Sequence, residues 1–211
     1  MVPTKEEMEE ALNQRHGARL QEAFSSTSVA VCGLGGLGSN IATALARAGI
    51  GKLTLIDFDR VDISNLHRQQ YKASQTGRYK TEALAANIAE IAPYTELEIH
   101  TVSITRENAA ELLRGAHIIC EAFDDAGCKA MLANSVLETM PDKYLVAASG
   151  MAGLGSANQI QTRRITERFY LCGDGVSDAD TGMGLVSSRV MLCAAHQAHM
   201  VLRILAGELQ A

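Results

Sequence analysis

The sequence predicts an α/β protein with a mainly parallel sheet, helices on both faces and a small antiparallel extension near the C-terminus. Three observations carry this prediction. Short apolar runs, typical of buried strands, alternate with longer helical segments between residues 28 and 148. A glycine cluster joins the first strand to the next helix. The 211 residues are 47% hydrophobic but only 4% aromatic, without Trp, so Ala, Leu, Ile and Val must build the core.

The first 27 residues are predicted to form an N-terminal helical arm. Thr4 and Glu7 have the spacing of a capping box, and the acidic residues around them favour the positive end of a helix dipole. Ser25, Ser26 and Thr27 then interrupt the helical pattern. No linker, repeat or low-complexity tract divides the remainder, so we expect a single domain over residues 28–211.

The alternation then assigns the elements in order. Strands are expected at 28–32, 52–56, 96–102, 116–121 and 143–148, and helices at 39–48, 80–92, 106–114 and 127–140. Beyond Ser149 the composition changes, and glycines mark a loop. Residues 157–163 and 167–171 are expected to pair as antiparallel strands. A second glycine-rich loop, 172–184, leads into a final helix through about Ala206.

Composition excludes several classes of function. Asp and Glu outnumber Lys and Arg by 24 to 19, and we therefore do not expect a nucleic-acid or anionic-membrane partner. No apolar stretch approaches the roughly 20 residues of a membrane span, and no signal peptide is expected. Five cysteines without a C-x-x-C pair predict a reduced, cytoplasmic protein. They are Cys32, Cys120, Cys128, Cys172 and Cys193.

The glycine cluster has the spacing of a phosphate-binding turn. Gly33, Gly35 and Gly38 match G-x-G-x-x-G between a strand and a helix. The first glycine permits the turn, the second lets phosphate approach the backbone, and the third lets helix and strand pack closely. Asp57 ends the second strand, where a carboxylate can accept hydrogen bonds from a ribose. These features predict a Rossmann-like sheet and leave NAD and ATP open as ligands.

Polar residues follow the later strands at the same edge of the predicted sheet. Asn65 and Arg68 lie on the loop after the second strand, and Lys80 begins the next helix. An Arg can hold phosphate oxygens with its planar fork of donors. Asp124 and Asp125 follow the strand 116–121. A carboxylate beside bound phosphates suits Mg²⁺, which takes one or two protein oxygens and keeps waters.

The ordered motifs G-L-G-G-L-G at 33–38, D-F-D at 57–59 and S-N-L-x-R-Q at 64–69, followed by Lys80, resemble the ThiF/MoeB/HesA adenylyltransferase family. These proteins are bacterial relatives of ubiquitin-activating enzymes. The closest likeness in character is to the short ThiF-like branch associated with thiamine biosynthesis. The resemblance implies a homodimer that binds ATP and Mg²⁺. It also implies adenylation of the C-terminal Gly carboxylate of a small ubiquitin-like, ThiS-like sulfur carrier ending in Gly-Gly, with release of pyrophosphate.

The resemblance also implies roles for residues of this chain. Arg68, Lys80 and Asp124 would be catalytic, with Asp124 on Mg²⁺ and Lys80 near the α-phosphate. Arg15, in the arm, would enter the ATP site of the partner subunit. Since the attacking carboxylate is already ionised, no general base is needed. The implied nucleotide-binding set is Gly33, Gly35, Gly36, Gly38, Asp57, Asp59, Ser64, Asn65, Leu66, His67, Arg68, Lys80, Asp124 and Asp125.

The sequence departs from the family pattern at its cysteines. Many relatives bind zinc through two C-x-x-C pairs, and this chain has neither, so no zinc site is expected. Asp180 stands where relatives often carry a sulfur-transfer cysteine. Cys172, in an expected flexible loop, is the candidate if this chain carries a sulfur step, and the other cysteines are expected to pack. His196 and His199 have no third metal ligand nearby in sequence.

Three other functions stay open. The glycine turn and Asp57 also fit an NAD-dependent oxidoreductase, although Asn65, Arg68 and Lys80 would then be unexplained. A related adenylating enzyme could act on a modified tRNA base, against which the acidic balance argues. A non-catalytic scaffold is the third alternative, and the complete set of polar residues argues against it.

Overall fold

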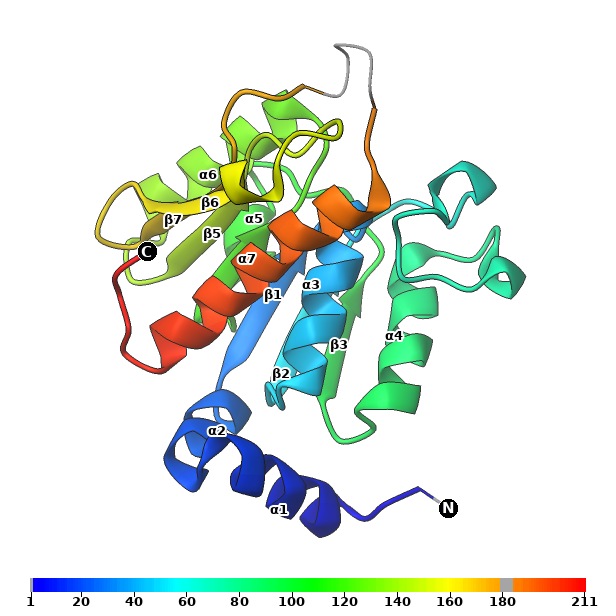
Figure 1. Cartoon of the computed structure of the whole chain (residues 1–211), viewed down its shortest axis with the longest axis vertical. Coiled ribbons are helices and arrows are strands. Elements are labelled where there is room, and N and C mark those ends of the chain that lie inside the picture. The colour runs from blue at the N-terminus through cyan, green and yellow to red at the C-terminus, as the bar shows by residue number, and fades with distance from the viewer. Residues whose placement is uncertain (1, 179–183) are drawn as a thin grey trace.

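A computed structural model describes residues 2–178 and 184–211. Its centre is one seven-stranded sheet in the order β3-β2-β1-β4-β5-β7-β6 (Figure 1). The strands are β1 Ser28–Cys32, β2 Lys52–Ile56, β3 Glu96–His100, β4 Ile118–Glu121, β5 Tyr144–Ala148, β6 Gln161–Arg164 and β7 Phe169–Gly173. All neighbours pair in parallel except β6 and β7, which are antiparallel. The predicted fold class is confirmed.

Helices cover both faces of the sheet. They are α1 Lys5–His16, α2 Ala18–Ser25, α3 Gly36–Arg47, α4 Lys80–Ile91, α5 Ala109–Leu112, α6 Ala126–Thr139 and α7 Ser187–Leu205. Single 3-10 turns lie at Ile63–Asn65, Ala73–Gln75 and Ala157–Gln159. Alternate residues of β1 point to opposite faces. Val29 and Val31 pack into the core that contains α3, α4 and α7, whereas Ala30 and Cys32 pack into the core under α5 and α6.

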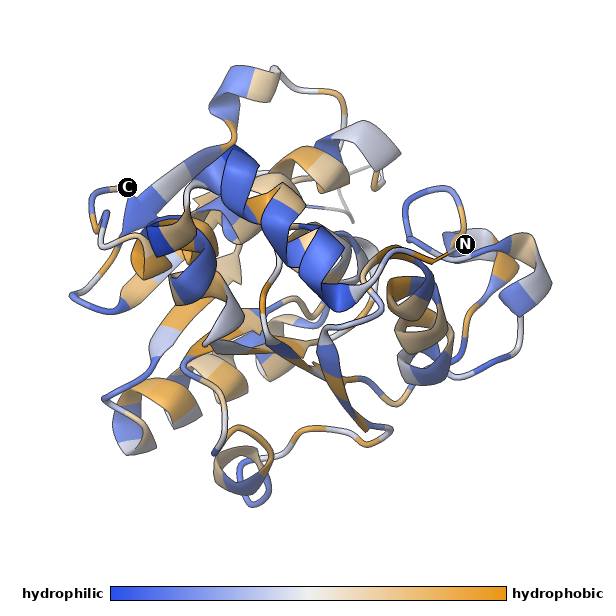
Figure 2. Ribbon diagram, turned by 90° about the horizontal axis from the view of Figure 1, so that it is seen from below, coloured by the Kyte–Doolittle hydropathy of each residue, from blue (hydrophilic) through white to orange (hydrophobic). Residues whose placement is uncertain are grey.

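The two N-terminal helices differ in how they join the body. Gly17, with φ +83°, separates α1 from α2. Phe24 of α2 is buried in the main core, whereas α1 is mostly hydrophilic and buries no residue fully (Figure 2). Only α1 therefore has the character of a projecting arm.

The structure corrects several expected boundaries: the helix expected at 106–114 is only α5 Ala109–Leu112, the strand expected at 96–102 ends at His100, and three further changes lie at glycine or polar turns. Helix α3 begins at Gly36, inside the glycine cluster, and not at Ser39. Residues 157–159 form a 3-10 turn, so the strand expected from residue 157 begins only at Gln161. Strand β7 extends to Gly173 and includes Cys172, which the sequence placed in a loop. Each of these last three errors arises at a glycine or polar turn, where pattern alone does not define the hydrogen bonding.

Within the described residues, no helix has both the length and the apolar character needed to cross a membrane.

Candidate functional site

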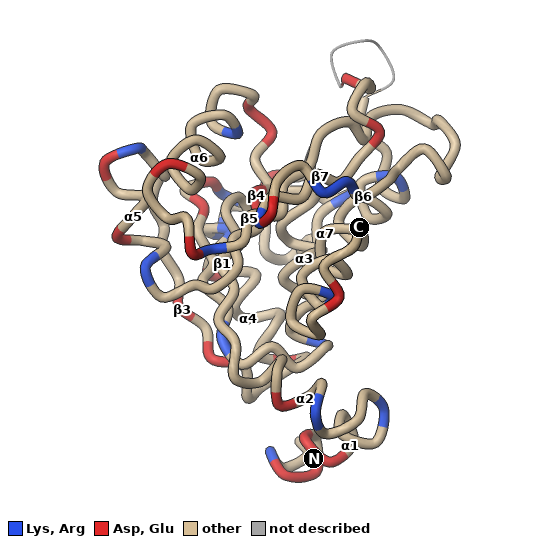
Figure 3. The backbone as a smooth tube through the Cα atoms, turned by 90° about the vertical axis from the view of Figure 1, so that its left-hand side faces the viewer, with Lys and Arg blue, Asp and Glu red and all other residues tan. Residues whose placement is uncertain are grey.

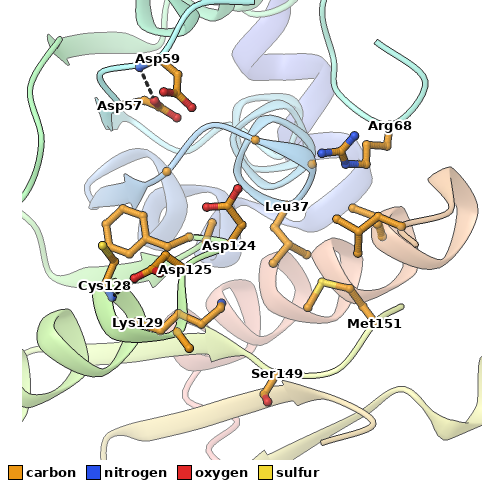
Figure 4. Close-up of a pocket in the computed structure, with 18 of the residues that line it drawn as sticks. Leu37, Asp57, Asp59, Arg68, Asp124, Asp125, Cys128, Lys129, Ser149 and Met151 are labelled. Carbon is orange, nitrogen blue, oxygen red and sulfur yellow. Dashed lines mark hydrogen bonds between the residues drawn. The ribbon is translucent and has the colours of Figure 1, made fainter. Parts of the chain in front are cut away.

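The carboxyl ends of β1, β2, β4 and β5 open onto a cavity of about 570 Å³. Strand order reverses between β1 and β4, and such a crevice is where open α/β sheets bind ligands. The glycine turn, the β2–α4 loop, the β4–α6 loop and the loop after β5 all contribute to its wall. Figure 4 shows these segments converging from different parts of the chain.

The glycine turn at the cavity is shaped by backbone contacts that side chains would prevent. Gly33 has φ +89°, and a Cβ atom there would lie 2.8 Å from the carbonyl oxygen of Ala122. A Cβ on Gly38 would overlap the carbonyl of Gly33, so helix α3 and strand β1 approach closely only with glycine here. Gly35 precedes α3 and offers no side-chain cap. The first-turn N–H groups of α3 are therefore available to an anion, which the helix dipole also favours.

Asp57 braces the glycine turn. Its carboxylate accepts hydrogen bonds from the backbone N–H of Leu34, at 2.6 Å, and of Asp59, at 2.7 Å. Burial raises the pKa of Asp57, and nearby Lys80 and the two N–H groups oppose that rise. The hydroxyl of Tyr71, which is also buried, donates to the carbonyl of Leu34 at 2.7 Å. Asp57, which the sequence predicts to bind a ribose, therefore holds the glycine turn in place.

Lys80 is buried and paired in the cavity wall. Its Nζ lies 2.6 Å from Asp59 Oδ2 and 3.9 Å from Asp57 Oδ2. Its charge is therefore shared between the two carboxylates of the D-F-D motif. The side chain of Asp59 is half exposed, so this pair forms an ionic edge along the β2 side of the cavity.

Arg68 faces the cavity from the other side of the glycine turn. Its Nη2 donates to Asn65 Oδ1 at 2.8 Å, while its buried Nε has no hydrogen-bond partner among the described residues. Burial lowers the pKa of the guanidinium and the charge of Asp124 opposes that shift. A guanidinium stays protonated in proteins, so Arg68 presents a positive charge with an unsatisfied donor beside the glycine turn.

Asp124 and Asp125 have different roles. Asp125 caps α6 by accepting a hydrogen bond from the backbone N–H of Cys128 at 2.7 Å. Asp124 makes no hydrogen bond within the described residues and its side chain points into the cavity (Figure 4). A free carboxylate opposite an anion site fits a hydrated Mg²⁺ that also takes phosphate oxygens. Among the described residues, the cavity included, no group of three or more His, Cys, Asp or Glu is arranged to hold a metal ion, so phosphate oxygens and water would have to supply the other ligands.

The structure divides the predicted nucleotide-binding residues. The residues that line the cavity are Gly33, Gly35, Gly36, Asp57, Asp59, Asn65, Arg68, Lys80, Asp124 and Asp125. Gly38, Ser64, Leu66 and His67 do not line it. Ser64 instead bonds to Asp62, and His67 lies within hydrogen-bond distance of the carbonyls of Ser64 and Leu185. These residues shape the loop that carries Asn65 and Arg68.

The structure places Cys172 in strand β7 and not in the flexible loop that the sequence predicted. It is fully buried in β7, its Sγ lies 3.5 Å from Thr162 Oγ1, and burial raises its pKa to about 11. A buried thiol with a raised pKa is a poor nucleophile. Cys128, expected to pack, is instead exposed and lines the cavity. Asp180 lies outside the described residues.

An ion pair between Glu121, which is buried, and Lys129, which lines the cavity, was not predicted from the sequence. Glu121, at the end of β4, is buried, and burial raises its pKa although Lys129 opposes the shift. Lys129 Nζ donates to both Glu121 oxygens, at 3.1 and 3.0 Å, and to the carbonyl of Ala148 at 3.1 Å. The pair ties α6 to the ends of β4 and β5. An acidic residue closing an apolar strand was the signal that could have revealed it.

A glycine turn, an acid at the end of the second strand and a cavity at the strand-order switch are typical of nucleotide-binding α/β proteins. Within that class the chain belongs to the ThiF family, whose family model matches residues 8–211.

Curated relatives match parts of the chain. It is 35% identical over 117 residues to adenylyltransferase and sulfurtransferase MOCS3 of Caenorhabditis briggsae, which covers 55% of this chain and 29% of that protein. It is 35% identical over 127 residues to the sulfur carrier protein adenylyltransferase of Thermus thermophilus, covering 58% and 47%. The chain thus matches less than half the length of these relatives.

Solved structures match the whole chain. The ATP complex of Escherichia coli tRNA N6-threonylcarbamoyladenosine dehydratase, TcdA, superimposes with a TM-score of 0.86. The alignment covers 99% of this chain and 98% of that one, at 22% sequence identity. At that identity the likeness establishes the shared fold alone.

Proposed function

We propose that this protein is an ATP-dependent adenylyltransferase that activates the C-terminal Gly carboxylate of a small ubiquitin-like sulfur carrier. The observation that carries the proposal is the meeting of Arg68 and Asp124 beside a glycine turn, in a cavity whose other edge is the Asp57–Asp59–Lys80 group. Membership in the ThiF family and the names of the curated relatives support the reaction and the acceptor. Thiamine or related sulfur-cofactor biosynthesis, in the cytoplasm, is the proposed setting.

In the proposed reaction the residues bind and orient rather than transfer protons. The first turn of α3 and Arg68 would hold the triphosphate, Asp57 and Asp59 would bind the ribose, and Asp124 would hold Mg²⁺, which supplies positive charge beside the phosphates when bound. The carrier's carboxylate attacks the α-phosphorus, a P–O bond forms, and the bond to the β-phosphate breaks to release pyrophosphate. Catalysis is then positioning plus electrostatic stabilisation of the charge on the α-phosphate, with Arg68 and Lys80 nearby.

We propose that the acceptor binds on the side of the cavity away from the proposed ribose edge, Asp57 and Asp59. Lys129, Ser149 and Met151 lie across Asp124 from Asp57 and Asp59 (Figure 4). We call residues 149–152 and 175–178, which line this side, the acceptor wall. The proposed carrier tail would lie along it and reach the α-phosphate.

A tRNA base is the second candidate acceptor, and the full-length match to TcdA is the observation that favours it. Against it stands the net charge of −5. In the view of Figure 3, Lys and Arg are interspersed with Asp and Glu along the backbone rather than gathered in a basic stripe. A tRNA partner needs a basic surface to neutralise phosphates.

The test is ATP–pyrophosphate exchange with a panel of carriers ending in Gly-Gly and, separately, with modified tRNA. We expect carrier-dependent exchange that falls at least about a hundredfold in Arg68→Ala and Asp124→Ala, because each removes charge stabilisation at the α-phosphate. Glu90→Gln, which breaks an exposed ion pair with Lys72, is the control and should keep full exchange. Exchange that survives both alanine variants would refute the site. NAD binding without ATP binding would favour an oxidoreductase. ATP binding without pyrophosphate exchange would favour a non-catalytic scaffold.

A further inference from the structure

The acceptor wall is built from two loops that follow neighbouring strands. Residues 149–152 follow β5 and residues 175–178 follow β7. Backbone bonds join them: Asp174 N–H donates to Gly150 O at 2.9 Å, and Gly175 N–H donates to Ser149 O at 3.0 Å. Ala152 N–H donates to Ser177 Oγ at 2.9 Å. The two loops therefore form one surface of the cavity.

Arg189, in the first turn of α7, fastens this surface from behind. The side chain is buried, with only 5% exposed, and its Nη2 donates to Asp174 Oδ2 at 2.7 Å. Its Nη1 donates to the carbonyls of Gly155 and Ser156. Asp174 in turn accepts at Oδ1 from the backbone N–H groups of Val176 and Ser177. One guanidinium thus holds both loops to α7.

The wall contains two glycines with positive φ, so the path of its backbone depends on the bonds that fasten it. Gly150 has φ +80° and Gly175 has φ +73°, and glycine loses most conformational freedom on folding. Burial alone would raise the pKa of Asp174, but the hydrogen bonds from Ser177, Val176 and Arg189 hold it well below the usual value. The carboxylate is therefore ionised at neutral pH, and losing either partner would leave an uncompensated buried charge or polar group.

The same turn of α7 also abuts the phosphate turn. A Cβ on Gly36 would lie 2.8 Å from Val190 Cγ1, so Val190 packs directly against the start of α3. Arg189 and Val190 are adjacent, and one rigid helical turn therefore spans from the acceptor wall to the glycine turn.

We propose that Arg189 and Asp174 are positioning residues that hold the acceptor wall in register with the phosphate turn, so that an acceptor tail presents its carboxylate to the α-phosphate. The inference rests on the proposed adenylation and assigns neither residue to the chemistry. Both residues act through the wall, because the loops they fasten line the cavity, whereas neither Arg189 nor Asp174 lines it. The Nη1 and Nη2 atoms of Arg189 donate to loop carbonyls and to Asp174, and its buried Nε has no hydrogen-bond partner among the described residues. The pair should matter to the acceptor and little to ATP.

The experiment compares Arg189→Met, Asp174→Asn and Arg189→Lys with wild type. ATP affinity is measured by calorimetry, and kcat and the KM for the carrier by pyrophosphate exchange. We expect the Met and Asn variants to raise the carrier KM by about tenfold to a hundredfold, the effect of a misplaced substrate-binding wall, with ATP affinity within about twofold. Arg189→Lys keeps the charge but not the fork of donors, so it should recover part of the loss.

The matched control is Glu90→Gln, which breaks the exposed Lys72–Glu90 pair at the same 2.7 Å separation and should leave every constant unchanged. If ATP affinity falls by the same factor as the carrier KM rises, or if neither constant changes, the positioning role is refuted. If Arg189→Met does not fold, Asp174→Asn carries the comparison alone. Failure of wild-type exchange with every carrier would instead refute the proposed function. Amide hydrogen exchange would then test separately whether the Arg189–Asp174 ion pair holds the acceptor wall. Faster exchange confined to residues 150–156 and 173–177 in Asp174→Asn would support this role, and unchanged exchange there would refute it.

Discussion

At the scale of single residues, the two aspartates after β4 differ in role although they are adjacent in sequence. Asp125 is used by the chain itself as the cap of α6, whereas Asp124 is free to meet a ligand. The helix start decides this division, because only the residue just before the first helical turn can reach its orphan N–H groups. A sequence reading names both residues and cannot order them until the helix boundary is known.

The cysteines show the same dependence on tertiary position. All five lie in the described part of the chain, and Cys128 alone is exposed, in the cavity wall beside Asp125. Its hydrogen bond with Asp125 is the main cause of a raised pKa, so its thiol is a slow nucleophile at neutral pH. Accessibility, not acidity, distinguishes it from the four buried thiols.

We therefore predict that a maleimide labels Cys128 alone in the native protein, and faster as pH rises. Saturating ATP should slow this labelling at least about fivefold, because the bound nucleotide would cover a thiol in the cavity wall. Peptide mass spectrometry locates the label, and Cys128→Ser is the control. Labelling of Cys172 before Cys128 would contradict the burial of Cys172 in β7.

At the scale of elements, the packing of α3 on β1 sets the phosphate turn. The helix begins three residues earlier than its composition indicates, because Gly36 and Gly38 are held by contacts with Val190 and Gly33 rather than by helix propensity. Tertiary contact here overrides the low helix propensity of glycine.

Gly38→Ala tests that contact. The added Cβ meets the carbonyl of Gly33, so strand and helix must separate, and we expect a loss of about 3 kcal/mol in the free energy of unfolding. Urea denaturation measures it. Gly115→Ala is the matched control, because its Cβ would meet no atom within 4 Å, and it should change stability by less than about 1 kcal/mol. Equal effects of the two substitutions would refute the close-approach role of Gly38.

At the scale of the whole molecule, the arm and the cavity lie at opposite ends of the sheet. Helix α1 lies beyond the amino ends of the strands, whereas the cavity is at their carboxyl ends (Figure 1). Arg15, exposed in the last turn of α1, is therefore far from the cavity of its own chain. This placement suits the proposal that Arg15 serves the site of a second subunit in a homodimer.

A mixing experiment tests this proposal. Arg15→Ala and Asp124→Ala proteins should each be inactive alone, because each homodimer lacks one group at both sites. After subunit exchange half the dimers are mixed and each has one complete site, so about a quarter of wild-type exchange should return. Sedimentation analysis checks that dimers form. A monomer, or no recovery on mixing, would exclude a partner-supplied Arg15.

The sequence by itself predicts the order of strands and helices and the edge of the sheet where ligands bind. Short apolar runs between helical segments, the glycine turn and the acid after the second strand predict the parallel sheet, its helical layers and the edge where ligands bind, since parallel strands must place their carboxyl ends together. The motifs also name Asp57, Arg68, Lys80 and Asp124, which the fold brings to one cavity.

Only the tertiary structure decides how those residues are used. Lys80 is paired with Asp59, Asp125 caps a helix, Cys172 is buried, and Arg189 clasps two loops from a helix far along the chain. Each outcome depends on hydrogen bonds and burial between segments distant in sequence. Local pattern determines which elements form, but the partner of a charged side chain is set by packing, because burial removes water and makes an unpaired charge costly.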